Sequence, residues 1–386
     1  KPKYCAQRVL VDIYKKNCEN CTRGEILLKR FYIYLLLGIG IVLTIPNTVF
    51  AEASCNFNEA GGNPITSDYA KLEERHLCNA DDVMEINSGA TMEVDPVVIK
   101  IGGSDGISIT NSGTISGGLK TINLGTGDNT ILTNEGTIQS DNQKVINVNA
   151  GGDNVTITNS GTIKGTSADN SGVGIYLAGD NAVLTNSKHI FTLKSKAVNV
   201  AGDNATITNQ SGGEIRAGSE IGSDGSVDAN HVNAVLFNNT DSDYKGTLEN
   251  YGKLTAAQST VKVGMQNVVI NNYSGGIIQH TDDAGGFASI SIGKDNATIT
   301  NKGTITGTHA LSHSIEVANG VEGTKIYVDG APTFTGEIEL NNAAANTTVY
   351  LECNMSQDTT IEIHNKPNLN ITNNLCGNDT YTIQDS

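Results

Sequence analysis

Apolar and polar residues alternate in short runs through the middle of the chain. An isoleucine lies between two threonines at residues 156–158, and the same order recurs at residues 206–208 and 298–300. Because successive side chains of a β-strand point to opposite faces, this period of two predicts strands with one buried face. Glycine, asparagine and aspartate bound the runs, and these residues favour turns. The pattern therefore predicts many short strands joined by tight turns.

A phrase of about thirteen residues repeats along the same region, as in solenoid proteins. Each copy holds a Gly-Asp-Asn-like turn, a strand, an Asn-x-Gly-like turn and another strand, and a further apolar run precedes it. The copies begin at Ser104, Gly127, Gly152, Gly202 and Lys294. Units measured between successive apolar runs are roughly 23 to 37 residues long, the range of one β-helical coil. The sequence predicts an all-β parallel β-helix solenoid with three short strands per coil and about eight regular coils over residues 97–319.

One asparagine recurs after the second strand of each unit. Stacked repeats bring such residues together, and we interpret them as a ladder of amides that faces inward or lines the turn. Ligand binding is the alternative for the same residues. The set is Asn111, Asn134, Asn159, Asn186, Asn209, Asn250, Asn272 and Asn301.

The start of the chain has the order of a secretory signal peptide, in which basic, apolar and small residues follow one another. Lys29 and Arg30 precede the apolar run 31–45, which is short for a membrane-spanning helix. We expect residues 1–51 to be the signal-peptide region, with cleavage after Ala51, or alternatively after Ala53.

No methionine precedes Met84. Either the initiator lies outside this sequence, or translation starts at a non-standard codon near Ile26 or Leu27. In the second case residues 1–25 are not translated.

Charge narrows the range of partners. The chain carries a net charge of −16, and removal of residues 1–51 takes away eight basic and three acidic residues, which leaves −21. A charge of this sign repels polyanions, so we expect neither nucleic acid nor an anionic membrane as a partner.

Four cysteines follow the predicted cleavage site, two before the first coil and two after the last. An even number in an exported chain favours disulfides. Three pairings are possible, but the two crossed ones require the ends of a solenoid to meet. We therefore expect Cys55 to pair with Cys78 and Cys353 with Cys376, the first pair within an N-terminal cap at residues 52–96.

The TNSGTI-type phrases behind a signal peptide resemble the passenger domains of bacterial autotransporters, and the resemblance covers about residues 97–308. It implies a right-handed β-helix at the bacterial outer membrane or cell surface, or secreted, with an outer-membrane translocator as a partner. Residues 320–386, with strands expected at 335–340 and 348–351, resemble the less regular end of a passenger. We expect a divergent β-rich cap there. In that family a C-terminal β-barrel serves as the translocator. Two interpretations stay open: a fragment of a longer protein, and a secreted relative without such a barrel.

Length variation points to a contact surface. The spacer after the third strand lengthens in three coils, and loops on a rigid scaffold often carry binding sites. We predict a non-enzymatic protein that acts in adhesion or surface interaction, through an unknown receptor or self-association. Tolerated surface insertions are the alternative. The candidate interaction residues are Asp169, Glu220, Asp224, Asp228, Asp282 and Asp283.

A secreted polysaccharide lyase or glycoside hydrolase is the alternative function. Asn239-Thr240-Asp241 with Asp282 and Asp283 resembles the NTD and DD motifs of polygalacturonases, where paired carboxylates supply acid and base. However, Asp241 is expected in the turn between the first two strands, whereas Asp282 and Asp283 follow the third. The low aromatic content, 5% with no tryptophan, leaves few platforms for sugar stacking.

The residues that could indicate a serine protease or calcium binding have simpler explanations. His309 and His313 lack the Gly-Asp-Ser-Gly context of a serine protease nucleophile. The Gly-Asp-Asn turns resemble calcium-binding repeats but lack their nonapeptide period, so hydrogen-bonded turns explain them better. We therefore predict no catalytic residue, no cofactor, no metal ligand and no small-molecule substrate.

Non-reducing peptide mapping of the exported protein tests the cysteine pairing. We expect fragments that join Cys55 to Cys78 and Cys353 to Cys376, because each pair closes a local loop worth roughly 3 kcal/mol. A fragment that joins Cys55 to Cys376, or free thiols, would contradict this arrangement.

Overall fold

A computed structural model describes part of the chain. The described residues are 69–70, 75–77, 81–94, 97–167, 172–218, 232–241, 243–281, 287–307, 313–330, 332–341, 346–352, 360–364, 369–374 and 382–385. The expected signal peptide, its cleavage at Ala51 and the four cysteines of the predicted disulfides lie outside this part.

The described residues form three parallel sheets and no helix. The 13-stranded sheet contains β2 (Arg75–Leu77), β5 (Val97–Ile101), β8 (Lys120–Asn123), β11 (Lys144–Val148), β14 (Ile175–Leu177), β17 (Val198–Val200), β20 (Val235–Asn238), β23 (Val261–Gly264), β26 (Ala288–Ile292), β29 (His313–Val317), β32 (Ile338–Leu340), β34 (Thr360–His364) and β36 (Thr382–Asp385). The 12-stranded sheet contains β3 (Val83–Ile86), β6 (Ser108–Asn111), β9 (Ile131–Asn134), β12 (Thr156–Asn159), β15 (Val183–Asn186), β18 (Ala205–Asn209), β21 (Gly246–Asn250), β24 (Val269–Asn272), β27 (Thr298–Asn301), β30 (Lys325–Val328), β33 (Thr347–Leu351) and β35 (Leu369–Asn373). The 11-stranded sheet contains β1 (Tyr69–Ala70), β4 (Thr91–Val94), β7 (Thr114–Gly117), β10 (Thr137–Ser140), β13 (Thr162–Gly165), β16 (His189–Thr192), β19 (Glu214–Ala217), β22 (Lys253–Ala256), β25 (Ile277–His280), β28 (Thr304–Thr306) and β31 (Thr333–Thr335).

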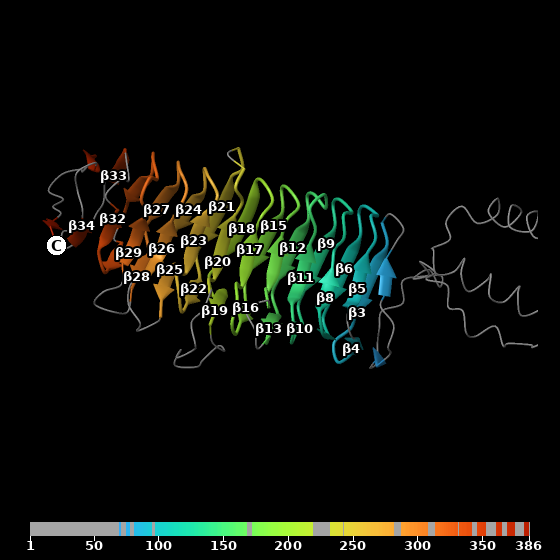
Figure 1. Cartoon of the computed structure of the whole chain (residues 1–386). Coiled ribbons are helices and arrows are strands. Elements are labelled where there is room, and N and C mark those ends of the chain that lie inside the picture. Colours follow the sequence, from blue (N-terminus) through green and yellow to red (C-terminus); the bar gives the residue numbers. More distant parts are fainter. Residues whose placement is uncertain are drawn as a thin grey trace, which may run out of the picture. The chain divides into compact units, whose positions relative to one another are not determined.

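Strands that neighbour one another in a sheet lie one coil apart in sequence. β12, for example, pairs in parallel with β9 and β15, and its Ile157 is in register with Leu132 and Leu184. Figure 1 shows the resulting stack of coils. The fold is therefore a right-handed parallel β-helix with three strands per coil, as the repeat predicts. The sheets also extend beyond the predicted regular region, with β1 to β4 before it and β30 to β36 after it.

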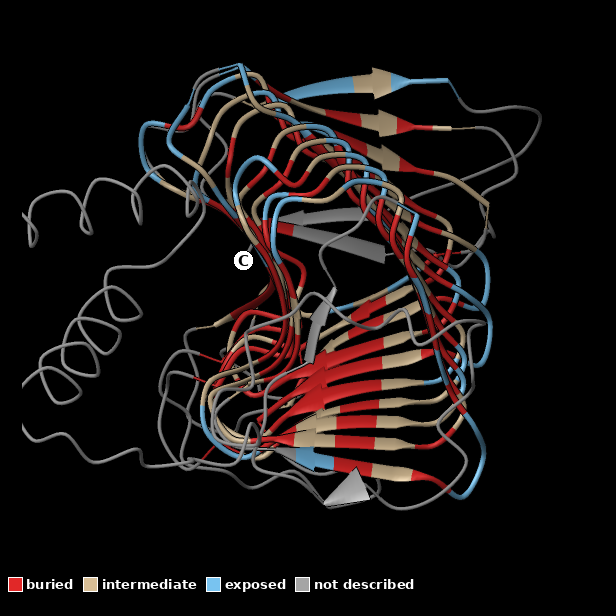
Figure 2. Cartoon of the chain, turned by 90° about the vertical axis from the view of Figure 1, so that its right-hand side faces the viewer, coloured by how far each residue is buried: buried red, intermediate tan, exposed pale blue. Residues whose placement is uncertain are grey.

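The interior is a continuous apolar column. Along β12 the buried residues Ile157 and Asn159 alternate with partly exposed threonines, as the period of two predicts. Figure 2 shows the same alternation of buried and intermediate positions on successive strands. Each fully buried isoleucine or leucine contributes roughly 1.5–3 kcal/mol relative to exposure. Because neighbours are in register, isoleucine or leucine stacks on its equivalent in the next coil.

The recurring asparagines form the predicted amide ladder. Asn134 Nδ2 donates to Asn159 Oδ1 at 2.7 Å, and Asn159 Nδ2 donates to Asn186 Oδ1 at 2.7 Å. Asn159 Nδ2 also lies 3.2 Å from the carbonyl oxygens of Gly161 and His189. The same amide-to-amide bond links every successive pair from Asn111 to Asn301, and all of these side chains are buried. This places the set inside the coil and not on a ligand-binding surface.

The glycine of each Asn-x-Gly turn allows coils to approach closely. A Cβ atom added at Gly136 would lie 2.0 Å from the Gly113 carbonyl oxygen, and one at Gly161 would lie 2.1 Å from the Gly136 oxygen. A side chain at Gly136 or Gly161 would push the coils apart, so these two turns require glycine. Lys188 occupies the equivalent position between β15 and β16, so the requirement does not extend to every coil.

The C-terminal end departs from the expected strands. Residues 335–340 do not form one strand, because Gly336, with φ of 88°, turns the chain between β31 and β32. Among the described residues, the 11-stranded sheet ends at β31 while the other two continue. The amide ladder also ends here, since Val328 occupies the position in register with Asn301. As a result, the buried Asn301 Nδ2 has no hydrogen-bond partner among the described residues.

Replacement of a mid-ladder amide tests its contribution to stability. We expect Asn159→Val to lower the free energy of unfolding by roughly 1–3 kcal/mol, because it leaves the buried Asn186 Oδ1 without its donor. Urea unfolding followed by circular dichroism measures the change. Asn301→Val is the matched control and should cost less, because it also removes the unpartnered Nδ2. An equal or larger loss at Asn301 would contradict the ladder as the source of the effect.

Candidate functional site

The corner between the 11- and 13-stranded sheets is the one where connection length varies most. Residues 118–119 suffice between β7 and β8, whereas residues 166–174 join β13 to β14, 218–234 join β19 to β20, and 281–287 join β25 to β26. β13, β19 and β25 belong to the same sheet, as do the strands that follow them. All three long connections therefore leave the same corner, as the sequence predicts.

A shorter connection separates each of these three from the next, whereas residues 307–312, in the coil after the third, form a connection of nearly the same length as 281–287. Between the three, residues 193–197 join β16 to β17, and residues 257–260 join β22 to β23. Because neighbouring strands are about 4.8 Å apart, successive members of the three lie roughly 10 Å apart along the corner. The spacing gives a long connection room beside the short one of the next coil.

The stems of the long connections are held by neighbouring coils. Val232 N donates to Gln258 Oε1 at 3.1 Å, and Asn233 Nδ2 donates to the Ser259 carbonyl. On the other side, Gly218 N donates to the Thr192 carbonyl at 2.9 Å. One stem of the connection 218–234 is therefore fixed by the short connection 257–260 of the following coil, and the other by β16 of the preceding coil.

The residues predicted for interaction are Asp169, Glu220, Asp224, Asp228, Asp282 and Asp283, and they lie outside the described residues. The described ends of the three connections that contain them lie at one corner. The prediction that they form an acidic contact surface stays a prediction.

The Gly-Asp-Asn turns connect the 13- and 12-stranded sheets and contain a second ladder. Asp153 Oδ1 accepts the Asp180 N–H at 2.9 Å, and Asp128 Oδ1 accepts the Asp153 N–H at 2.9 Å. The bonds continue from Asp105 to the backbone of Lys245. The asparagine that follows adopts a positive φ, as at Asn154 with 57°. These contacts support hydrogen-bonded turns as the explanation for the motif.

The carboxylates of this ladder give the corner a negative potential. Asp180 and, more weakly, burial and the nearby aspartates raise the pKa of Tyr244. On the 13-stranded sheet, by contrast, burial and the neighbouring Lys120 lower the pKa of Lys144. Lys144 Nζ donates to Asn147 Oδ1 at 2.8 Å and lies 3.6 Å from the centre of the Tyr176 ring. Charge is thus distributed unevenly around the coil.

The polygalacturonase-like motif is not assembled into a catalytic pair among the described residues. Asn239 and Asp241 lie in the connection between β20 and β21, where Asp241 N donates to Asn239 Oδ1 at 2.9 Å and Asn239 Nδ2 donates to the Ala201 carbonyl. Asp282 and Asp283 lie outside the described residues, but the stems at Thr281 and Phe287 are at the other corner. The amide of Asn239 therefore has a structural role in its turn.

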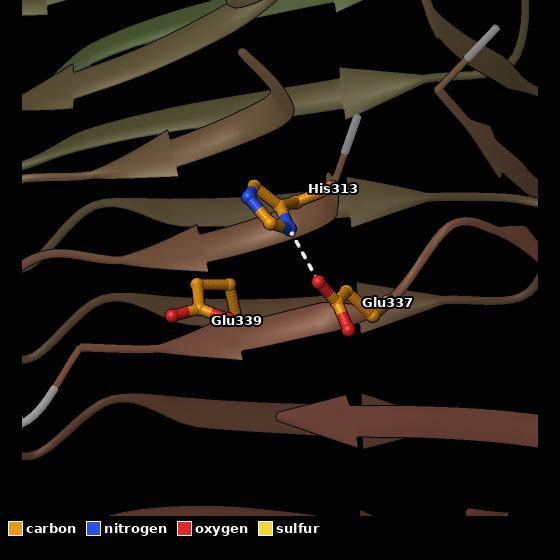
Figure 3. A group of neighbouring side chains, drawn as sticks. All are labelled: His313, Glu337 and Glu339. Atoms are coloured by element: carbon orange, nitrogen blue, oxygen red, sulfur yellow. Dashed lines mark ion pairs between the residues drawn. The ribbon is translucent and has the colours of Figure 1, made fainter. Parts of the chain in front are cut away.

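One cluster brings a histidine and two glutamates together, and we call it the His313 cluster. His313 begins β29, Glu337 immediately precedes β32, and Glu339 lies within β32. His313 Nδ1 lies 3.2 Å from Glu337 Oε1, and one ligand atom of each residue lies within 4.8 Å of the other two. Figure 3 shows the imidazole of His313 directed at Glu337, with Glu339 nearby on β32.

The sequence interpretation missed this cluster. It considered His313 only as a protease histidine, and the two glutamates lie more than twenty positions away. The available signal was the spacing of one coil, which places β29 and β32 side by side. Glu337-x-Glu339 then puts two carboxylates on one face of a strand next to His313.

Comparison with known proteins gives no relative: a scan against protein-family models, a search of curated proteins and a search of solved structures each found no match. In the part of the chain that the structure describes, no helix combines the length and apolar character needed to cross a membrane.

The role of the aspartate ladder can be tested at Asp153. We expect Asp153→Ala to lower the free energy of unfolding by about 1 kcal/mol, because the Asp180 N–H loses its acceptor. Asp153→Asn keeps an acceptor oxygen and should change it by less than about 0.5 kcal/mol. Thermal and urea unfolding measure both. A calcium-dependent stabilisation of the parent protein that Asp153→Asn abolishes would contradict a purely structural role.

Proposed function

We propose that this chain is an exported β-helical passenger of the autotransporter type, displayed at a bacterial surface or secreted, which acts by contact and not by catalysis. An outer-membrane translocator is the expected export partner. The sequence resemblance suggests this assignment, and the parallel β-helix is compatible with it. The same fold is compatible with polysaccharide-degrading enzymes, so the arrangement of the surface has to distinguish the two functions.

The observation that carries the proposal is that connection length varies most widely at one corner, from residues 118–119 to residues 218–234. Loops on a rigid scaffold are common places for recognition, because they vary without disturbing the core. The strands on either side of these connections lie in line, and the stem of the longest connection is braced by Gln258 and Ser259. A line of variable loops on a rigid solenoid favours recognition of an extended surface or a second macromolecule.

The described polar ladders favour contact over catalysis. The amide ladder is buried inside the coil, and the aspartate ladder accepts backbone hydrogen bonds from the next coil. A glycosidase needs two carboxylates across a scissile bond. The aspartates that could supply them are predicted at separate corners, which supports the non-enzymatic function over the polysaccharide-cleaving alternative.

Shortening the longest connection tests the proposed function. We expect replacement of residues 219–231 by two glycines to weaken attachment of the full chain to cell or glycan surfaces at least tenfold, since the contact surface is removed while the coil remains. Fluorescence measurement of bound protein on a panel of cells and immobilised glycans gives the result, and circular dichroism checks the fold.

A charge variant serves as the control. Asp224→Asn with Asp228→Asn keeps the length of the connection and separates charge from shape. Undiminished attachment after the deletion, or release of reducing ends from polysaccharides by the parent protein, would overturn the proposal. Protease accessibility on intact cells tests surface display.

A further inference from the structure

We propose that the His313 cluster binds a divalent transition-metal ion of the zinc type and thereby ties two successive coils together. The site would use His313 Nδ1 and one oxygen each from Glu337 and Glu339. Among the described residues, this is the one group of three or more histidine, cysteine or acidic side chains whose ligand atoms lie close enough to share an ion. The proposal is independent of the proposed function.

The distances fit a small ion with little rearrangement. Zinc binds histidine nitrogen and carboxylate oxygen at about 2.0–2.2 Å, so two ligand atoms of a tetrahedral site lie about 3.4 Å apart. His313 Nδ1 and Glu337 Oε1 are 3.2 Å apart, and Glu339 supplies its oxygen within 4.8 Å of both. To complete three protein ligands, the Glu339 carboxylate has to move closer to the other two ligand atoms.

The lack of a hydrogen bond at the buried Nδ1 atom of His313 favours a ligand there. His313 Nδ1 is buried and faces the Glu337 carboxylate, yet it makes no hydrogen bond of normal geometry with a described residue. A buried nitrogen without a hydrogen bond carries an energetic cost that metal coordination removes. A neutral imidazole nitrogen is also the usual protein donor to zinc.

The backbone holds the ligands in place before an ion binds. Ser314, next to His313, donates both its N–H at 2.8 Å and its hydroxyl at 3.0 Å to the carbonyl of Glu337. Ser314 is fully buried, so this double contact is shielded from water. Register pairs Glu316 with Glu339 in the same two strands. Pairing of β29 with β32 therefore positions the cluster, with Glu337 held directly before β32 by Ser314.

A second histidine and glutamate pair shows the contrast. His189 Nδ1 lies 4.0 Å from Glu214 Oε2 across β16 and β19, but Arg216 and Lys253 lie 3.7 and 4.0 Å from the other oxygen of Glu214. That carboxylate already has cationic partners, and no second carboxylate joins the group. His189 Nδ1 is likewise buried without a hydrogen bond to a described residue, so His189 is a matched control for a histidine that faces a glutamate but has no second carboxylate beside it.

The donor set selects the class of ion. Calcium and magnesium prefer sites made entirely of oxygen, whereas imidazole favours zinc and the neighbouring first-row divalent ions. One nitrogen and two carboxylate oxygens leave at least one coordination position for water. The position in the fold suggests a structural effect. The ion would link β29 to β32 just beyond the end of the amide ladder at Asn301, where the 11-stranded sheet also ends among the described residues.

The test uses the full chain, freed of metal with a chelator and without an affinity tag, titrated with Zn²⁺ alone. Isothermal titration calorimetry should show one site, and Zn²⁺ should raise the thermal midpoint because it binds only the folded state. His313→Gln and Glu339→Gln should each weaken the affinity at least tenfold. His189→Gln and Glu316→Gln should leave it unchanged, the latter because Glu316 is held by Asn341 and is not a ligand.

X-ray absorption of the zinc complex identifies the donors directly. We expect nitrogen and oxygen ligands with one imidazole. Absence of a stoichiometric site, affinity unchanged in both His313→Gln and Glu339→Gln, sulfur ligands, or equal loss in Glu316→Gln would each overturn the proposal. Glu339→Gln keeps the size of a partly exposed strand residue, so it remains informative if the histidine variant folds poorly.

Discussion

Hydrogen bonding between equivalent positions of successive coils is the constraint on which this structure depends. Each coil leaves backbone N–H and C=O groups on both of its edges, and only the next coil can satisfy them. The amide ladder extends the same rule to side chains inside the coil, where Asn134, Asn159 and Asn186 exchange hydrogen bonds away from water. A coil that lost register would break the backbone bonds and the amide ladder together. The repeat is therefore preserved by geometry before function is considered.

The same constraint explains why only one corner varies widely. Between the 12- and 11-stranded sheets, the amide ladder and the close approach of Gly136 to Gly113 allow few conformations. Between the 13- and 12-stranded sheets, aspartates such as Asp153 tie each turn to the next. The third corner has neither ladder, so insertions there interrupt neither of them. Physical tolerance alone would place the long connections where they are, and the proposed recognition would use a position that the ladders leave available.

Most of the fold follows from the sequence because the repeat records it directly. The alternation at residues 156–158 fixes which side chains face inward, and the recurring Asn159 position predicts the ladder. Departures from the repeat were harder to predict. The turn at Gly336 divides an expected strand, and the coils near the two ends have lost the repeated phrase. The His313 cluster was missed because it depends on the register between β29 and β32, which the pattern of either strand alone does not contain.

The ends of the solenoid need contacts that the repeat does not supply. Within the described coils the amide ladder runs from Asn111 to Asn301, and beyond it Ile86 and Val328 occupy the equivalent positions. Terminal coils of a solenoid have a neighbour on one side only, so they open at the lowest free energy. Cross-coil ties of another chemical kind would have their greatest effect there, because they oppose the first step of unfolding. The His313 cluster lies where the ladder has stopped, and the sequence places the four terminal cysteines outside the same limits.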